Sequence, residues 1–131
     1  MKKELIICVI IIFTIIVGNI FTESYTSDAV TLISDNLHEL RNDVISDIEN
    51  VDAGKVMEKT RLIEDKWHEV YYIMAYFIEH EELEKVETSL IAIESYIEAG
   101  EYGESVSKID ESVFILEHIK KKYEVTLQNI F

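Results

Sequence analysis

The feature that most constrains this 131-residue chain is an uncharged, apolar segment close to its start. Residues 5–21, LIICVIIIFTIIVGNIF, contain no Asp, Glu, Lys or Arg. As a helix this segment is about 26 Å long, which is near the lower end of what crosses the hydrocarbon core of a bilayer. We therefore expect residues 5–21 to form a transmembrane helix.

Charged residues flank this segment asymmetrically. Lys2 and Lys3 precede it, whereas Glu23 and Asp28 follow it. Basic flanks remain on the cytoplasmic side of a membrane. The predicted topology is therefore a short cytoplasmic tail at residues 1–4, an anchor at residues 5–21 and an extracytoplasmic domain at residues 22–131.

A cleaved signal peptide is the alternative interpretation of the same segment. Signal cores are shorter, about 7–15 residues, and they end at a small-x-small site, which Thr22-Glu23-Ser24 matches only weakly. The one cysteine, Cys8, precedes most of the apolar core, whereas a lipidation site follows it. We expect Cys8 to act as an apolar side chain facing lipid or a partner helix.

The remainder of the chain is strongly acidic. Residues 22–131 hold 25 of the 26 acidic residues and ten of the 12 basic ones, a formal net charge of −15. Such a surface repels the phosphates of nucleic acids and of anionic lipids, so nucleic acid is not an expected partner. A solvated helical surface is the simplest interpretation. A basic partner and loosely held cations are the alternatives.

Apolar residues after residue 26 recur at intervals of three and four, which is the period of a helix rather than a strand. The chain has no proline and four glycines, which also favours long helices. Ser27 or Asp28 is the expected N-cap of the first helix after the anchor, and Gly54 is its expected end. Residues 100–103, GEYG, are the expected end of the third. The four predicted stripes are Val30, Ile33, Leu37, Leu40, Val44, Ile48 and Val51; Val56, Ile63, Trp67, Val70, Met74 and Phe77; Leu83, Val86, Leu90, Ile93 and Ile97; and Val106, Ile109, Val113, Leu116, Ile119 or Tyr123, Leu127 and Ile130.

The second and third stripes are out of register. Continuing from Phe77 by seven requires an apolar residue at position 84, which is a glutamate, whereas the third stripe begins at Leu83. One straight helix cannot bury both stripes, so we expect a break at residues 79–82. In this arrangement His80 ends the second helix, and Glu81 and Glu82 open the third, each beside the dipole end that suits its charge.

The predicted fold class is all-α: one transmembrane helix followed by an antiparallel bundle of about four helices. Short loops make neighbouring helices antiparallel, which groups them as two hairpins. Leu37 and Ile48 recur 49 positions later as Val86 and Ile97, and residues 96–106 have the form of a tetratricopeptide-type turn. A tetratricopeptide-like pair of hairpins is therefore one candidate arrangement.

Two carboxylate-x-x-histidine pairs raise a metal hypothesis. Asp35 and His38 form the first pair, and Asp65 and His68 form the second. Di-metal bundles place such ligands in the core and use glutamates. If the apolar neighbours of these pairs face the core, all four side chains face solvent, so we expect no metal and no cofactor.

An aromatic series lies on one face of the second helix. His68, Tyr72, Tyr76 and His80 follow one another at intervals of four, with Trp67 beside them. These side chains either pack against a neighbouring helix with their polar atoms in water, contact another protein, or line a small-ligand cleft. The sequence contains no Gly-rich phosphate loop, no Cys-x-x-Cys and no nucleophile motif, so it does not indicate an enzyme.

Two stretches accompany the apolar anchor and the acidic helical region: FIEHEELEKVETSL at residues 77–90 and EHIKKKYEVTLQNIF at residues 117–131. In these features, from about Val51 onward, the chain resembles a bacterial family known as domain of unknown function 4363. The resemblance implies a small single-span membrane protein with a helical outer domain, no assigned activity and a membrane partner. The matching positions are Trp67, His80, Glu81, His118, Asn129 and Phe131.

The expected function is an accessory or adaptor role for another cell-envelope protein. A ligand- or cation-sensing bundle is the alternative, which the acidic surface and the four histidines favour. The candidate partner-contact or family-marker residues are Trp67, Tyr72, Tyr76, His80, Glu81, His118 and Asn129.

Overall fold

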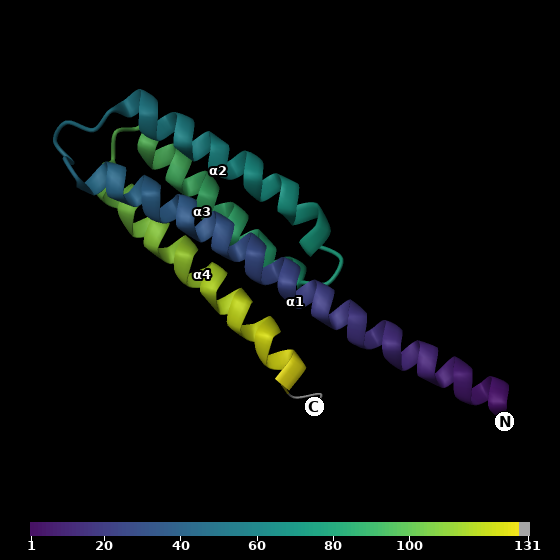
Figure 1. The fold of residues 1–131 in the computed structure, drawn as a ribbon. Coiled ribbons are helices and arrows are strands. Elements are labelled where there is room, and N and C mark those ends of the chain that lie inside the picture. The colour runs from purple at the N-terminus through teal and green to yellow at the C-terminus, as the bar shows by residue number, and fades with distance from the viewer. Residues whose placement is uncertain (129–131) are drawn as a thin grey trace.

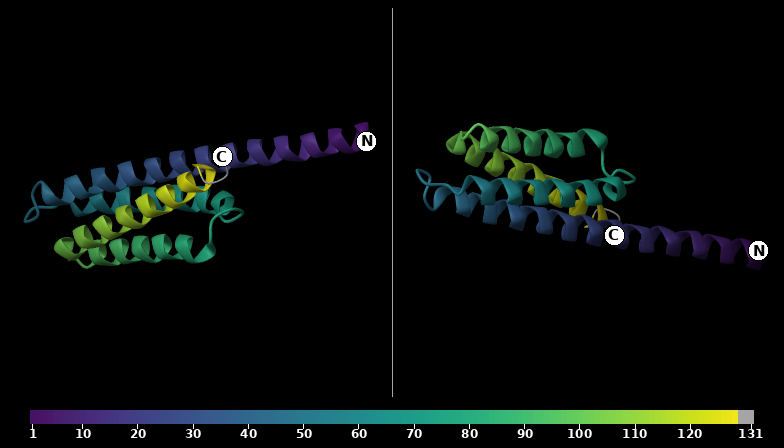
Figure 2. Two further views of the ribbon diagram at one scale, coloured as in Figure 1. Left: turned by 90° about the horizontal axis from the view of Figure 1, so that it is seen from below. Right: turned by 90° about the horizontal axis from the view of Figure 1, so that it is seen from above.

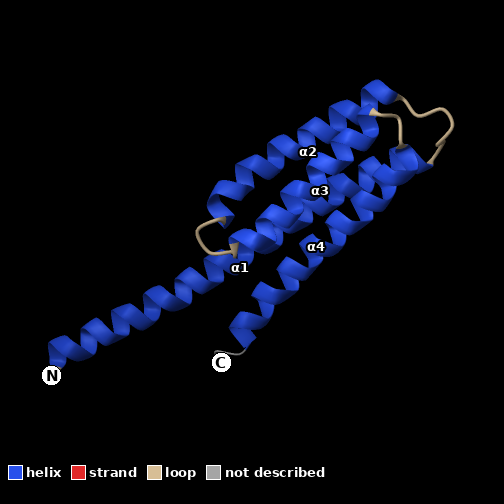
Figure 3. Cartoon of the chain, turned by 180° about the vertical axis from the view of Figure 1, so that it is seen from behind, coloured by secondary structure: helices blue, strands red, loops and turns tan. Residues whose placement is uncertain are grey.

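Four helices run alternately up and down in the computed structural model, which describes residues 1–128 and their side chains as far as Glu124 (Figure 1). The helices are α1 (Lys2–Ile45), α2 (Ala53–Met74), α3 (His80–Glu98) and α4 (Tyr102–Gln128). Figure 3 shows that only short loops join them. The predicted all-α class is confirmed.

The helices close into a ring rather than an open row. α1 packs against α2 and α4, and α3 packs against the same two helices (Figure 2). Arg41 of α1 forms a bidentate ion pair with Asp110 of α4, with its Nε 2.7 Å from Oδ1. This pair joins the first and last helices of the ring. A tetratricopeptide array stacks each unit only on its neighbours, so this closed bundle differs from it.

α1 is one continuous helix from the apolar segment into the bundle, so the predicted N-cap at Ser27 or Asp28 is wrong. The Thr22 hydroxyl donates to the carbonyl of Asn19 at 3.0 Å, and the Thr26 hydroxyl to that of Thr22 at 2.7 Å. These side chains bond within the helix instead of capping a new one. With no proline or glycine in residues 19–28, nothing local stops the helix.

The start of α1 projects beyond the bundle. It contains a stretch long and apolar enough to cross a membrane, and no residue of that stretch is buried within the structure. Burial in the bundle begins at Thr26, about one turn after the apolar segment ends at Phe21. The helix therefore has an exposed apolar half and a half that packs in the bundle.

The predicted stripes form the core. Trp67 and Leu37 are among its largest fully buried side chains. Among the stripe residues whose side chains the structure describes, the exposed exception is Ile48, because α1 already ends at Ile45. The side chain of Leu127 and the whole of Ile130 lie outside the described part. Gly54 does not end that helix: it lies in the first turn of α2, whose N-cap Asp52 accepts from the Lys55 backbone N–H at 3.0 Å. The buried apolar side chains are Ala29, Val30, Ile33, Leu37, Leu40, Val44, Val56, Ile63, Trp67, Met74, Ile78, Leu83, Val86, Leu90, Ile93, Ile97, Ile109, Leu116 and Ile119.

The sequence predicted the ends of α2 and α3 more closely than the start and end of the first bundle helix. The break between the second and third stripes exists, at residues 75–79, a few positions earlier than expected. α3 ends before Gly100, whose φ of +71° is the left-handed conformation that glycine adopts at low cost. The Glu101 backbone N–H then donates to the carbonyl of Tyr96 at 2.8 Å, which closes the helix end.

Candidate functional site

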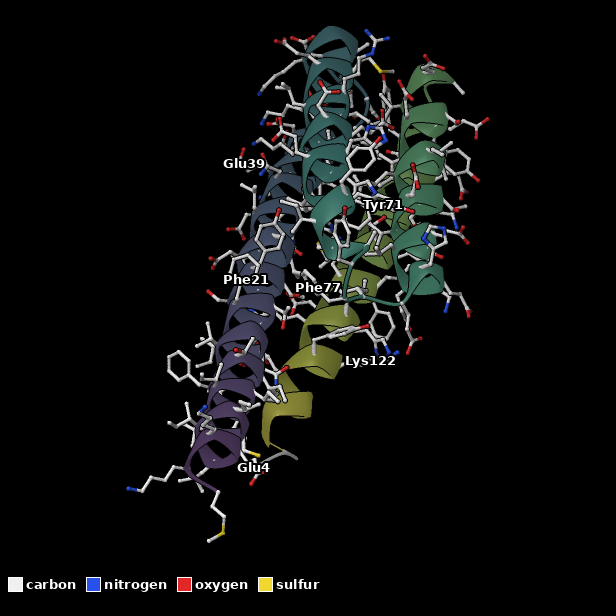
Figure 4. The ribbon with its side chains drawn as sticks, turned by 90° about the vertical axis from the view of Figure 1, so that its right-hand side faces the viewer. Glu4, Phe21, Glu39, Tyr71, Phe77 and Lys122 are labelled. Atoms are coloured by element: carbon white, nitrogen blue, oxygen red, sulfur yellow. The ribbon has the colours of Figure 1, made fainter. Side chains whose placement is uncertain are left out.

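The residues singled out in the sequence gather mainly at one end of the bundle, the end from which the apolar half of α1 projects. We call this end the bundle base, and define it by Tyr25 of α1, residues 75–79, and Lys122 and Tyr123 of α4. The Tyr25 ring meets Phe77 edge-on at 6.3 Å, and the Tyr123 hydroxyl accepts from the Glu79 backbone N–H at 2.9 Å. Figure 4 shows Phe77 and Lys122 at this end of the bundle, beyond which the start of α1 with Glu4 projects.

The two tyrosines of the aromatic series do not pack against a neighbouring helix. Tyr72 is 73% exposed and Tyr76 is 90% exposed. Tyr71, one position from the predicted series, is half-buried, and its ring makes edge contacts of 5.9 Å with Trp67 and 6.1 Å with His80. Burial raises the pKa of the Tyr71 hydroxyl, with a smaller effect from the nearby carboxylates Glu87 and Glu84. The tyrosines that face solvent are therefore free to contact something outside the chain.

His80 opens α3 instead of closing α2, which corrects the sequence prediction. Its Nε2 lies 3.0 Å from Glu84 Oε1, and its Nδ1 lies 3.2 Å from the Tyr71 hydroxyl oxygen. The chain turns early because Ile78, which belongs to neither stripe, is drawn into the core and is only 4% exposed. The sequence placed His80 beside the negative C-terminal end of the second helix. In the structure the negative group beside His80 is the carboxylate of Glu84.

The carboxylates around His80 form ion pairs with lysines. Glu81 lies in the first turn of α3, as predicted, 3.2 Å from Lys85. Lys122 of α4 lies 3.2 Å from Glu79 and 3.4 Å from Glu82. Its hydrogen bond to Glu79 is the main cause that raises the pKa of Lys122. These contacts join the α2–α3 turn to α4.

Trp67 is a core residue rather than a surface contact, being 1% exposed. Its indole N–H makes no hydrogen bond in the described part of the chain, and the same is true of the buried Glu64 Oε1. Both residues line a cleft of about 140 Å³, which we call the α2–α3 cleft. Burial raises the pKa of Glu64, and the carboxylate of Glu94 across the cleft adds to this effect. The cleft is lined by Glu64, Trp67, His68, Glu87, Leu90, Ile91 and Glu94.

A larger hollow lies on the other side of α3. It encloses about 510 Å³ between α3 and α4, and a second hollow of about 310 Å³ shares its residues Lys85 and Ile115. We call the two together the α3–α4 groove. His118, a predicted candidate, lines the second hollow with Phe114, which is 73% exposed.

The proposed metal ligands point away from the core. Asp35, His38, Asp65 and His68 are all exposed, as the stripe argument predicted. Among the residues that the structure describes, no group of three or more His, Cys, Asp or Glu side chains could hold an ion together. The arrangement can therefore bind through apolar contact and through charge, and it shows no preformed metal centre within residues 1–128.

The structure brings some candidates together and separates others. Tyr76 lies in the bundle base and His80 directly follows it in the chain, whereas His118 belongs to the α3–α4 groove and Asn129 lies outside the described residues. Phe114 and Glu64 were not predicted from the sequence. A large apolar residue beside the stripe of α4 was the available signal for Phe114; for Glu64, which resembles every other helix glutamate, there was none.

Comparison with known proteins identifies the family. A family model described as Domain of unknown function (DUF4363) matches residues 24–130. Neither the curated proteins nor the solved structures gave a match. The matched region begins just after the apolar segment and spans the whole bundle, which confirms the resemblance seen in the sequence. The chain belongs to the domain of unknown function 4363 family.

Proposed function

We propose that this protein is a single-span membrane protein of the bacterial envelope, with a cytoplasmic N-terminus and an extracytoplasmic bundle. In this proposal the bundle serves as a non-catalytic accessory or adaptor for another envelope protein. The supporting observation is the continuity of α1, whose apolar half leaves most of its large side chains about half exposed or more. Such a surface is unfavourable in water, and a bilayer would cover it.

A continuous helix suits a presenting role because it holds the bundle at a set height. Asp110 pairs with Arg41, and Phe114 lies one helical turn closer to the bundle base. Arg41 lies about 30 Å along α1 from Phe21, where the apolar segment ends, at 1.5 Å per residue. Phe114 is one turn nearer the base, so it lies about 25 Å from the end of the apolar segment. A partner bound there must extend that far out of the membrane.

The α3–α4 groove is the contact surface we propose for that partner. Phe114 supplies an exposed aromatic anchor, and Ile115 and His118 lie next to it. Lys85 and Glu82 give the hollow a charged edge. An apolar centre with a polar rim is the usual composition of a protein contact.

Site-specific crosslinking in intact membranes tests this proposal. A photoreactive residue at position 118 should give one adduct of constant mass, and Phe114→Ala should reduce its yield several-fold by removing the apolar anchor. The matched control is Leu62→Ala, which removes an exposed apolar side chain from α2, outside the groove. If position 118 gives no specific adduct, or if both variants reduce it equally, the groove is not the contact.

The anchor is tested separately. The full chain should remain with membranes after washing in alkaline carbonate, because a helix that crosses the bilayer resists this treatment. Quantitative release of a shortened chain would instead support the cleaved signal peptide. Either result leaves the groove experiment interpretable.

A sensing role is the second candidate, and the α2–α3 cleft favours it. The indole N–H of Trp67 and Oε1 of Glu64 are a buried donor and a buried acceptor without partners, beside two further carboxylates. A small ligand with a cationic group could pair with the carboxylates, and an acceptor atom on the same ligand could accept from the indole N–H. Thermal unfolding with Ca²⁺, Zn²⁺ or small amines would show stabilisation by mass action. If millimolar concentrations do not shift the unfolding temperature, the accessory role is the one remaining candidate.

A further inference from the structure

We propose that the bundle base rests on the lipid headgroups of the bilayer that α1 crosses, with Tyr76 and Ile73 immersed among them. Tyr72 would lie at the upper edge of the same layer. This inference rests on the proposed anchor at residues 5–21 and adds a second point of membrane attachment. It assigns to lipid the tyrosines that the sequence left as candidates for a protein contact.

The height of the bundle base supports this assignment. Tyr25 follows Phe21 by one helical turn, and the two rings stack at 6.1 Å. Phe77 meets Tyr25 at 6.3 Å, so the turn between α2 and α3 lies at the level of Tyr25. Four residues of helix advance about 6 Å. The headgroup layer of one leaflet is of similar thickness, roughly 5–8 Å, so the turn lies within it.

The side chains presented at this height are those that the layer accepts. Within residues 72–76, Tyr76 is 90% exposed, Tyr72 is 73% exposed and Ile73 is 41% exposed. Elsewhere in the described bundle the exposed large apolar side chains are scattered along the helices and loops. Tyrosine combines an apolar ring with a polar hydroxyl, which is why it is enriched where hydrocarbon meets water.

The distribution of charge over the bundle is compatible with contact between the bundle base and lipid headgroups. A net charge of −15 on residues 22–131 repels anionic headgroups as a whole. At the bundle base, however, Glu79 and Glu82 are paired with Lys122. The opposite end carries two loops, residues 46–52 and 99–101, which contain four acidic residues and no lysine or arginine. The end that faces the bilayer is therefore the end where lysine offsets the carboxylates.

Two attachments would limit how far the bundle can tilt. The bundle packs along one side of α1, so a tilt of α1 within the bilayer would carry the bundle toward or away from the membrane surface (Figure 2). Contact between the α2–α3 turn and the headgroups restricts that leaning. The α3–α4 groove would then keep a constant height and direction for its partner.

Depth-resolved fluorescence quenching of the full chain in phosphatidylcholine vesicles tests the inference. Cys8→Ser supplies a background without cysteine, and single cysteines at positions 76, 48 and 12 carry an environment-sensitive dye. Ile48 is the matched control because it is exposed at the opposite end of the bundle. Ile12 reports on the anchor.

We expect headgroup nitroxides to quench the dye at position 76 several-fold more than the dye at position 48, with a blue-shifted emission at position 76. Nitroxides deep in the acyl chains should quench position 12. If position 12 is quenched but position 76 behaves like position 48, the base does not touch lipid, although the anchor stands. If position 12 is not quenched, the anchor itself fails. If position 76 is unquenched in vesicles yet crosslinks to a protein in cell membranes, its partner is that protein.

Discussion

Glu64 is the residue whose chemistry departs most from that of an ordinary helix glutamate. It lies partly buried in the α2–α3 cleft, where Glu94 faces it and Arg61 lies 3.7 Å from Glu94. Arg61 pairs with Glu94, whereas Glu64 Oε1 is buried without a partner, so Glu64 is the group that is costly to charge. Burial and the carboxylate of Glu94 raise the pKa of Glu64, which means that the folded chain holds its proton more tightly than the unfolded chain does.

The pH dependence of this effect follows from its sign. Below the ordinary pKa of 4.5 both states are protonated, and Glu64 does not affect stability through its charge. As the pH rises through the raised pKa, the folded state must ionise a buried group and loses stability. Glu64→Gln should therefore raise the free energy of unfolding at pH 7 and leave it unchanged at pH 4. Denaturant unfolding at both pH values measures this difference.

The control for this substitution is Glu58→Gln, which changes an exposed carboxylate on the same helix. It should alter the free energy of unfolding little at either pH. A Glu64→Gln variant that is less stable than the wild type at pH 7 would show that the carboxylate accepts a stabilising bond as an anion, contrary to this account.

At the scale of the helix, the ends are decided by backbone conformation and by which side chains the core admits. Gly100 adopts a left-handed φ of +71°, and the chain reverses there into α4. Gly103, three residues later, has no such requirement because it lies in the first turn of α4. The two glycines of GEYG therefore have different roles.

Alanine substitutions separate these roles. Gly100→Ala should lower the free energy of unfolding by about 1 kcal/mol, because a side chain is strained in the left-handed conformation. Gly103→Ala is the matched control: nothing lies within 4 Å of its added methyl group, and it should be neutral or stabilising by about 0.5 kcal/mol. Thermal or denaturant unfolding of both variants measures the difference. Equal effects would contradict the assignment of the helix end to Gly100.

At the scale of the whole molecule, the continuity of α1 couples the bundle to the apolar segment. A flexible joint would let the two move independently, whereas a helix without interruption transmits position and direction. Ser24 lies in the middle of this joint and is exposed, so its side chain can be changed without disturbing the core.

Ser24→Pro should loosen this coupling. Proline removes a backbone hydrogen bond and collides with the preceding turn, at a cost of about 3 kcal/mol in a helix interior. Spin labels at Ile12 and Ile48, both exposed on opposite sides of the joint, should show a broadened distance distribution in the variant and a narrow one in the wild type. Ser24→Ala is the control and should keep the narrow distribution. An unchanged distribution in the proline variant would show that the bundle is held by other contacts.

The sequence by itself determined the helical class, the four apolar stripes and the break between the second and third. Each of these is a local property: a stripe such as Leu83, Val86 and Leu90 is visible in one window of the chain. The family followed from short motifs for the same reason. The outward direction of Asp35 and His38 was also predictable, because it depends only on their angle to the stripe.

Tertiary structure alone decided what each candidate residue contacts. Tyr72 and Tyr76 became exposed side chains, although the sequence also allowed them to pack against a neighbouring helix. The bundle base joins Tyr25, Phe77 and Tyr123, which are far apart in the chain, and only the closing of the ring brings them together. The continuity of α1 belongs here too: Ser27 and Asp28 are good caps, but a cap forms only where the chain turns, and the packing of α1 into the bundle leaves no turn there.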